Sequence, residues 1–365
     1  MFPKRREFIA RAGIGAVATA LAAPAIAQTQ PQIRWRMASS FPKSLDTLFG
    51  TAEQIAGRVS RLTEGRFEIR VFAGGEIVPP LQVLDAVQNG TVECGQSASY
   101  YYVGKNPALA FDTALPFGMN ARQQNAWMYQ GGGLQLMREL FSQYNIVSFP
   151  CGNTGTQMAG WYRKEIKSVA DLKGLKMRVA GLAGQILAKL GVVPQQIGGA
   201  DIYPALEKGT IDAAEWVGPY DDEKLGFHKV ARYYYYPGWW EGSAQLSIYV
   251  NAKQWAALPK AYQEALDVAC VEANVGMMAR YDAKNTEALR KLVSAGAQLR
   301  AFPRPVMEAC YKVAQELYAE LSEKSADFKK IYAPWSRFRD DQYLWFRVAE
   351  NTFDNFVYSV KKPAK

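Results

Sequence analysis

The chain has 365 residues, of which 49% are hydrophobic and 21% charged, and it carries a formal net charge of +9. This composition is typical of a globular protein, the length predicts about two domains, and disordered or collagen-like chains are excluded. A single histidine, His228, excludes metal sites that need several histidines, and four cysteines without a C-x-x-C pair exclude zinc ribbons and thioredoxin-like motifs.

Residues 1–27 have the pattern of a bacterial export signal. A basic head with Arg5-Arg6 precedes an apolar run over residues 12–23, which is too short to span a bilayer, and Ala25-Ile26-Ala27 forms a small-residue cleavage site. The arginine pair resembles a twin-arginine signal, which delivers folded proteins, and the alternative is an ordinary signal with a basic head. We therefore expect a cleaved signal and a periplasmic protein.

The remaining charge and the cysteines narrow the choice of partner and compartment. The leader accounts for +3 of the net charge, and the other +6 is scattered without a block of lysines or arginines, so no nucleic-acid surface is indicated. Cys94, Cys151, Cys270 and Cys310 could pair in the periplasm. A protein that folds before export favours buried free thiols instead.

Residues 33–71 predict a β-α-β unit. Apolar side chains alternate over residues 33–37 and again over residues 67–71, as in half-buried strands. Between them, apolar residues recur every three or four positions over residues 45–62, and Gly65 ends this helical pattern. This order predicts an α/β fold with a mostly parallel sheet.

One nine-residue pattern occurs twice. Residues 86–94 and 205–213 both read as the end of a helix, a glycine suited to a left-handed cap and a strand. Such junctions are common, so coincidence is the alternative, but we interpret the repeat as two lobes of the same construction. Ligands of open α/β sheets bind beyond the carboxyl ends of the strands, so residues 96–102 and 215–220 should form opposite walls of one cleft.

The pattern changes after residue 245. Residues 245–250 predict a strand, and a helical pattern then runs from about residue 261 to residue 295, beginning near Pro259. This helix would be about 50 Å long, enough to brace both lobes. A later apolar stripe must pack on its own chain or on another, and the pattern alone favours its own chain; the stripe contains Phe346, Ala349, Phe353, Phe356, Val357 and Val360.

Several polar residues in apolar surroundings are candidates for a binding site. Arg178 lies in a predicted strand, where an arginine needs an anionic partner such as a carboxylate; the alternative is an exposed edge strand. Glu215, Glu241 and Gln157 could supply the oxygen atoms that hard cations bind, although isolated glutamates are usually solvated. The run of tyrosines at residues 100–102 could supply hydroxyl groups, with at least one tyrosine in the core as the alternative.

Enzyme motifs are scarce. The sequence has no G-x-S-x-G elbow, the glycines at residues 131–133 lack the lysine of a phosphate-binding loop, and His228 has no nucleophile motif beside it. A carboxylate pair formed by Glu215 and Glu241 stays open as a catalytic alternative, because sequence does not give their separation.

Two segments carry a resemblance to a known family. Residues 171–178, with the sequence DLKGLKMR, and residues 209–216, with the sequence GTIDAAEW, resemble the extracytoplasmic solute receptors of TRAP transporters, the DctP family. The resemblance extends over essentially the whole mature chain. Residues 215–219 resemble the TakP-type subgroup that binds 2-oxo acids such as pyruvate, whereas many other members have asparagine in place of Trp216.

The resemblance implies a periplasmic binding protein of type II-like architecture, with two hinge-linked lobes and a long bracing helix. Lobe I would contain residues 32–152 and 245–284, and lobe II residues 153–244 and 285–333. Residues 334–365 would form a C-terminal helix that two copies exchange in a homodimer.

The resemblance also implies roles for particular residues. Arg178 stands where the family has its carboxylate-binding arginine. The cation ligands would be Gln157, Glu215, the carbonyl of Trp216 and Glu241, and further ligand contacts would come from Asn153 and Tyr101. The TakP type implies Na⁺ and other relatives imply Ca²⁺, and cation selectivity depends on cavity size and ligand number.

The expected function is therefore a periplasmic receptor without enzymatic activity. It would capture a pyruvate-like 2-oxo monocarboxylate with a bridging cation and deliver it to the membrane permease of a TRAP transporter. The alternatives are a receptor for lactate or another small organic acid, a periplasmic enzyme acting on a carboxylate, and a binding protein of an ABC importer. The long helix after Pro259 favours the TRAP receptor over the ABC type.

Overall fold

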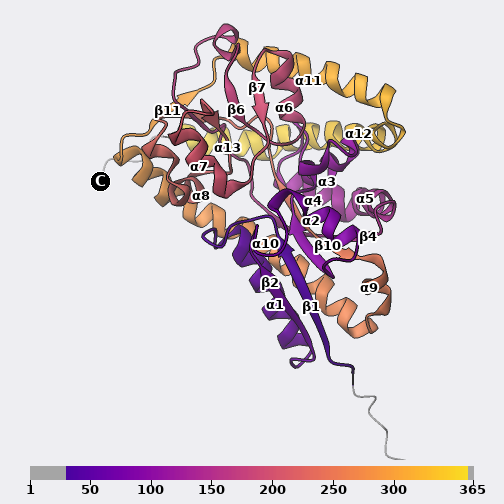
Figure 1. The fold of residues 1–365 in the computed structure, drawn as a ribbon. Helices are drawn as coiled ribbons and strands as arrows, with labels where there is room; N and C mark the ends of the chain where they lie inside the picture. The colour runs from indigo at the N-terminus through magenta and orange to yellow at the C-terminus, as the bar shows by residue number, and fades with distance from the viewer. Residues whose placement is uncertain (1–29, 361–365) are drawn as a thin grey trace, which may run out of the picture. The chain divides into compact units, whose positions relative to one another are not determined.

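The computed structural model describes residues 30–360, which contain two β-sheets surrounded by helices (Figure 1). The predicted export signal at residues 1–27 lies outside the described residues. All four cysteines are buried and unpaired, as expected for a protein that folds with free thiols.

The first sheet has the strand order β2-β1-β3-β10-β4. Strands β1, β2 and β3 are parallel to one another, and β10 is antiparallel to both of its neighbours. The predicted β-α-β unit is confirmed at its expected position, with helix α1 beginning at Leu48 because Leu45 belongs to the preceding turn. The elements are β1 (Ile33–Ser39), α1 (Leu48–Leu62), β2 (Phe67–Phe72), β3 (Cys94–Ser97), β4 (Ile146–Asn153) and β10 (Gln245–Asn251).

The second sheet has the strand order β11-β9-β5-β8-β6-β7, and β5 is antiparallel to both of its neighbours. Each sheet therefore has one reversed strand, and in both cases it is the first strand after the chain crosses from the other sheet. The prediction of mostly parallel sheets holds for the other strands. The strands are β5 (Trp161–Tyr162), β6 (Lys176–Arg178), β7 (Val193–Gln195), β8 (Ala213–Ala214), β9 (Tyr233–Tyr236) and β11 (Gln298–Ala301).

The structure confirms the repeated unit found in the sequence. Helices α2 (Val83–Gln88) and α7 (Gly199–Glu207) are each followed by a glycine, Gly90 or Gly209, with the same φ of +71°. The amide of the next threonine donates to the carbonyl of the fifth residue before it, at 2.8 Å in the first copy and 3.0 Å in the second. The orders β2-β1-β3-β10-β4 and β7-β6-β8-β5-β9 also correspond strand for strand, so the two sheets share one construction.

The long helix predicted after Pro259 is α10 (Lys260–Ser294). It packs against β4 of the first sheet, against α1 and against α8 (Pro219–Leu225), which follows β8 of the second sheet (Figure 1). Tyr281 of α10 donates a hydrogen bond of 2.7 Å to the buried carboxylate of Asp221 in α8. This helix therefore contacts elements of both sheets, as a bracing helix should.

The remaining helices cover the sheets and extend to the C-terminus. Among the described residues, no helix is both long and apolar enough to cross a membrane. The α-helices are α3 (Ala110–Thr113), α4 (Ala121–Gln130), α5 (Gly133–Ser142), α6 (Gly181–Lys189), α9 (Ala252–Ala257), α11 (Arg304–Lys324), α12 (Ala326–Val348) and α13 (Glu350–Ser359). The short 3-10 helices are η1 (Pro80–Gln82), η2 (Ser99–Tyr102), η3 (Pro107–Leu109), η4 (Val169–Leu172) and η5 (Phe227–Lys229).

The C-terminal apolar stripe differs from its prediction. The first half of α12 is anchored, since Trp335 is buried and packs against Phe111. In α13, however, Phe353 and Phe356 are 66% and 70% exposed. The expectation that this stripe packs on its own chain is wrong, because the contacts of α13 with α12 and the ion pair of Glu350 with Arg122 leave its apolar face uncovered.

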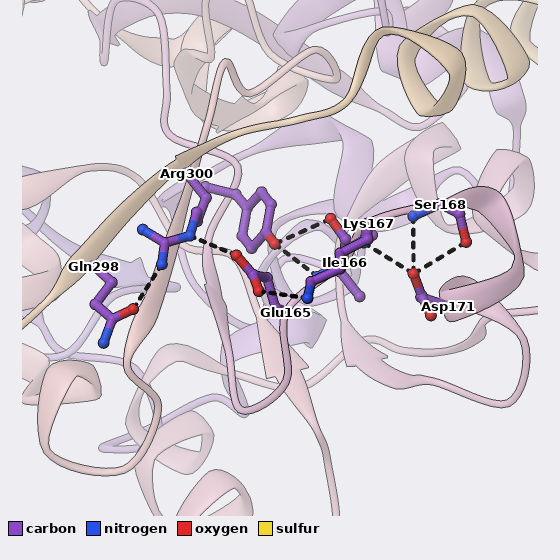
Figure 2. A network of polar contacts seen from close by, with 8 residues as sticks. Glu165, Ile166, Lys167, Ser168, Asp171, Gln298 and Arg300 are labelled. Carbon is purple, nitrogen blue, oxygen red and sulfur yellow. Dashed lines mark hydrogen bonds and ion pairs between the residues drawn. The ribbon is translucent and has the colours of Figure 1, made fainter.

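A polar network fixes the loop before η4 at the edge of the second sheet (Figure 2). Arg300 of β11 donates to Glu165 at 2.7 Å, and the Asp171 carboxylate accepts from the amides of Lys167 and Ser168. The hydroxyl of Tyr235 contacts both the amide and the carbonyl of Ile166. None of these residues lines the cavity described below, so we assign the network a structural role.

Candidate functional site

A narrow cavity lies between elements of the two sheets. Its volume of about 10 Å³ has room for roughly one water molecule, so in this arrangement the walls of the cleft lie close together. Residues that follow β3 line one wall and residues that follow β8 line another, where the repeated unit predicted the cleft. The lining residues are Phe41, Leu48, Ala98, Tyr100, Tyr101, Thr154, Gln157, Trp216, Val217, Ala244 and Leu246.

The two segments that connect the sheets run side by side next to this cavity. The amide of Thr154 donates to the carbonyl of Ala244, and the amide of Gln157 donates to the carbonyl of Glu241, both at 3.1 Å. The amide of Met158 donates to the carbonyl of Val217, which joins the first crossing segment to the segment after β8. Backbone hydrogen bonds therefore hold Gln157 and Glu241, which are distant in sequence, close together.

Arg178 is at the end of β6 and only 1% exposed. Its Nη1 forms an ion pair with the Glu215 carboxylate and also donates to the Glu215 carbonyl at 2.7 Å, while Nε donates to the Ile197 carbonyl at 3.3 Å. The guanidinium carbon lies 4.9 Å from the centre of the Trp216 ring. The alternative of an exposed edge-strand arginine is therefore wrong, and the charge is held beside a residue that lines the cavity.

Glu215 and Glu241 are both buried, at 0% and 1% exposure. Burial raises the pKa of Glu215 against the opposing effect of Arg178, and burial together with the charge of Glu215 raises the pKa of Glu241 well above its usual range. Arg178 is the positive charge that acts on both carboxylates. When Glu215 and Glu241 are both ionised, the three side chains therefore have a net negative charge.

Three side-chain oxygens at this place have no hydrogen-bond partner within residues 30–360. They are Oε1 of Gln157, Oε2 of Glu215 and Oε2 of Glu241. Buried polar atoms almost always have partners, so three orphaned acceptors in one site could hold a ligand that supplies positive charge or hydrogen-bond donors. Carboxylate and amide oxygens are the ligands of hard cations such as Na⁺ and Ca²⁺. Within residues 30–360, no group of three or more His, Cys, Asp or Glu residues is placed to hold a metal ion. At this site one of the three oxygens belongs to an amide, that of Gln157.

The three tyrosines at residues 100–102, predicted as possible ligand contacts, have two different locations. Tyr100 and Tyr101 line the cavity, and their rings stack with centroids 5.0 Å apart. Tyr102 belongs to the core, because its hydroxyl accepts from the amide of Leu84 at 3.1 Å, so the core alternative is correct for this residue. Burial raises the pKa of Tyr101 despite the nearby charge of Arg178, so it acts as a neutral hydroxyl.

Asn153 and His228 lie outside the cavity lining, and so do Arg178, Glu215 and Glu241, which are buried behind the residues that line it. Asn153 is buried at the end of β4, where its Oδ1 accepts from the amide of Gly155 at 2.9 Å and its Nδ2 has no partner among the described residues. His228 is half-buried with its ring 6.4 Å from the ring of Trp161, which agrees with a structural role.

Sequence reasoning missed part of the apolar lining, including Phe41, Leu48 and Leu246. Phe41 follows β1, and its ring packs edge-on against Trp216 at 6.3 Å. The rule that ligands bind beyond the carboxyl ends of strands could have located Phe41, because β1 is parallel to β3.

Comparison with known sequences gives a consistent result. The profile of the DctP family, described as bacterial extracellular solute-binding protein family 7, matches residues 38–325. The chain is 52% identical over 362 residues to the monocarboxylate 2-oxoacid-binding periplasmic protein of a Nostoc species, covering 98% of this chain and 99% of that protein.

Solved structures with the same fold include two TRAP solute-binding proteins. The one from Bordetella bronchiseptica is 61% identical with a TM-score of 0.89, covers 90% of this chain and 98% of its own, and is described as a mixed-occupancy dimer with copurified calcium and picolinate. The one from Pseudoalteromonas atlantica is 41% identical with a TM-score of 0.87, covers 90% of this chain and 100% of its own, and holds sodium and pyruvate.

Proposed function

The chain belongs to family 7 of the bacterial extracellular solute-binding proteins, the DctP family, and from this premise we propose that it is a TRAP transporter receptor for a small 2-oxo monocarboxylate. Its relatives are transport proteins that bind solutes, so the function is capture and delivery of a ligand without its chemical conversion. The periplasmic enzyme is therefore set aside.

The observation that carries this proposal is the set of three partnerless oxygens beside Arg178. One cation would satisfy Gln157, Glu215 and Glu241, with the carbonyl of Trp216 as a further ligand. Arg178 would hold the carboxylate of the acid, and the cation would supply further positive charge to the bound acid. The sodium with pyruvate and the calcium with picolinate in the two solved relatives support this arrangement.

The charges allow either cation. Two glutamates, a ligand carboxylate and Arg178 sum to a formal charge of −2, which Ca²⁺ would neutralise and Na⁺ would reduce to −1. Selectivity between the two ions depends on cavity size and ligand number, and the TakP-type resemblance favours sodium. We propose a single cation, with sodium favoured and calcium accepted.

We further propose that each sheet is the core of one lobe. Lobe I would contain residues 32–152 and 245–284, and lobe II residues 153–244 and 285–333. The two crossing segments would form the hinge, and a ligand that touches both lobes would stabilise the closed arrangement because it binds that arrangement better. The strand content of the two sheets supports these bounds.

The delivery partner and the compartment follow from the same family. We propose that the receptor acts in the periplasm and hands its ligand to a TRAP membrane permease. The periplasmic name of the Nostoc relative supports this location, as does the export signal predicted at residues 1–27.

Calorimetric titration tests the proposed ligand and cation together. Pyruvate titrated into EDTA-treated protein should release no binding heat in a sodium-free buffer, and addition of sodium or calcium should restore one site per chain. The reason is that without a cation the ligand would bring a third carboxylate beside Glu215 and Glu241. Equal binding with and without cations would contradict the bridging role. A second titration with lactate, under the same conditions, distinguishes a receptor for 2-oxo acids from one for 2-hydroxy acids.

The exposed face of α13 supports a homodimer in which two copies exchange their C-terminal segments, residues 334–365. Exposed apolar patches of this kind mark interaction surfaces, and Phe353, Phe356 and Tyr358 are 66–80% exposed. A second copy would give the stripe the partner that its own chain does not provide.

Removal of residues 349–365 should convert this dimer into a monomer. The cut after Val348 keeps Trp335 and Tyr343, whose ring and hydroxyl contact the rest of the chain, so the fold should be unaffected. Light scattering should give the mass of one chain, and pyruvate affinity should change by less than about threefold. A shortened protein that keeps the mass of two chains would contradict exchange through α13.

A further inference from the structure

The loop between β7 and α7, residues 196–198, reaches from the second sheet to an element of the first. Nε2 of Gln196 donates a hydrogen bond of 2.8 Å to the carbonyl of Tyr101 in η2, the 3-10 helix that follows β3. The next residue, Ile197, uses its carbonyl to accept from Nε of Arg178 at 3.3 Å. Adjacent residues of one loop thus contact the proposed anion-binding arginine and the opposite wall of the cavity.

Close packing on both sides of this hydrogen bond makes the contact sensitive to the separation of the sheets. A Cβ at Gly181, which has a φ of +65°, would lie 2.5 Å from Cδ2 of the Tyr100 ring. On the other side, a Cβ at Gly198 would sit at ordinary van der Waals distance, 3.5 Å, from the ring of Pro80 in η1, so these elements are also in contact. Gly181 therefore allows the two walls to meet, and the Gln196 hydrogen bond forms only when they do.

We propose that Gln196 is a positioning residue that couples closure of the cleft to the orientation of Arg178. This coupling rests on the proposed receptor function. Gln196 itself does not touch the ligand. When the walls meet, the Gln196 amide fixes Tyr101, and the same loop fixes Arg178 through the Ile197 carbonyl. Opening breaks the bond to Tyr101 and frees the loop that holds Arg178, so release of the acid and opening occur together.

This role predicts an effect on one rate constant. The bond is absent when the ligand first meets the open cleft, so the association rate should not depend on it. In the closed complex it adds one hydrogen bond, which is worth about a three- to tenfold change in an equilibrium constant. Q196A should therefore release pyruvate about three to ten times faster than the wild type, with an unchanged association rate.

The experiment is stopped-flow tryptophan fluorescence with pyruvate and saturating calcium, using Trp216 in the cavity wall as a reporter. Q196E is the decisive second variant, because glutamate keeps the size of glutamine but, when ionised, cannot donate to a carbonyl. It should release pyruvate at least as fast as Q196A. Q195A is the matched control, since the Gln195 side chain makes no hydrogen bond to the described residues, and it should behave like the wild type.

The outcomes separate the two proposals. Wild-type protein that does not bind pyruvate with any cation would overturn the receptor proposal and this coupling with it. Wild-type binding with unchanged release rates in Q196A and Q196E would overturn the coupling alone. Faster release in Q196A with wild-type release in Q196E would show that side-chain packing acts there, and would also overturn the role of the donated hydrogen bond.

Discussion

R178M should abolish pyruvate binding, with a dissociation constant raised by about a hundredfold or more. The ligand carboxylate would enter a buried site next to Glu215 and Glu241 without a positive charge, and loss of one partner from a desolvated charge pair is among the largest single-residue effects. Calorimetry with pyruvate at saturating calcium measures the loss. A folded R178M protein that binds pyruvate with near wild-type affinity would remove Arg178 from the site.

Two further variants separate binding from folding. R178M leaves the Glu215 carboxylate buried without its ion-pair partner, which destabilises a protein by about 3–5 kcal/mol, whereas R178M/E215Q removes both charges and should recover much of that stability. The double variant should melt near the wild type and still not bind pyruvate. R300M is the matched arginine control, because Arg300 pairs with Glu165 in the network of Figure 2 and should leave affinity unchanged.

E241Q should weaken cation binding by roughly a hundredfold, because a charged ligand of the cation becomes neutral while its shape is kept. In the absence of a cation the same variant should be at least as stable as the wild type, since burial and Glu215 already disfavour the charged form of Glu241. Calcium titration by calorimetry and melting curves in EDTA measure the two effects. Opposite signs for cation affinity and cation-free stability distinguish a ligand from a structural carboxylate.

D221N provides the control for this prediction. Asp221 is also fully buried, burial raises its pKa to about 7, and its Oδ1 has no partner in the described part of the chain, but its Oδ2 accepts a hydrogen bond from Tyr281 of the long helix α10. D221N should bind calcium like the wild type. Because a cation must displace a proton from a carboxyl of raised pKa, wild-type cation affinity should also fall as the pH is lowered. E241Q with unchanged calcium affinity would contradict the proposed cation site.

The sequence predicted the elements that local patterns determine. The strands on either side of α1, the glycine caps at Gly90 and Gly209, and the long helix after Pro259 all depend on residues close together in the chain. The two-residue strands β5 and β8 are too short to show an alternating pattern. Their place in the second sheet comes from pairing with distant segments, which one sequence does not reveal.

For the candidate site, the sequence predicted the residues but not how they contact one another. Arg178, Glu215, Glu241 and Gln157 stood out because polar residues in apolar contexts need partners, and the structure places them together in the buried region beside the cavity. Their mutual contacts arise from backbone hydrogen bonds between the two crossing segments, whose pairing no periodicity predicts. The sequence also could not predict which surface covers the C-terminal apolar stripe, since a helical pattern identifies the apolar face of a helix but not the surface that packs against it.

The reversed strand of each sheet has a consequence for how the protein folds. Strand β10 lies between β3 and β4, so the first sheet is incomplete until the ribosome has passed residue 251. In the second sheet, β5 comes directly after β4 in the chain and lies between β8 and β9, which are synthesised later. Neither sheet is built from a contiguous piece of chain, and a nascent chain that stops before β10 would expose the unpaired edges of β3 and β4 to aggregation. The two sheets should therefore acquire stability in one late, cooperative step, with the slow kinetics that long-range strand pairing imposes.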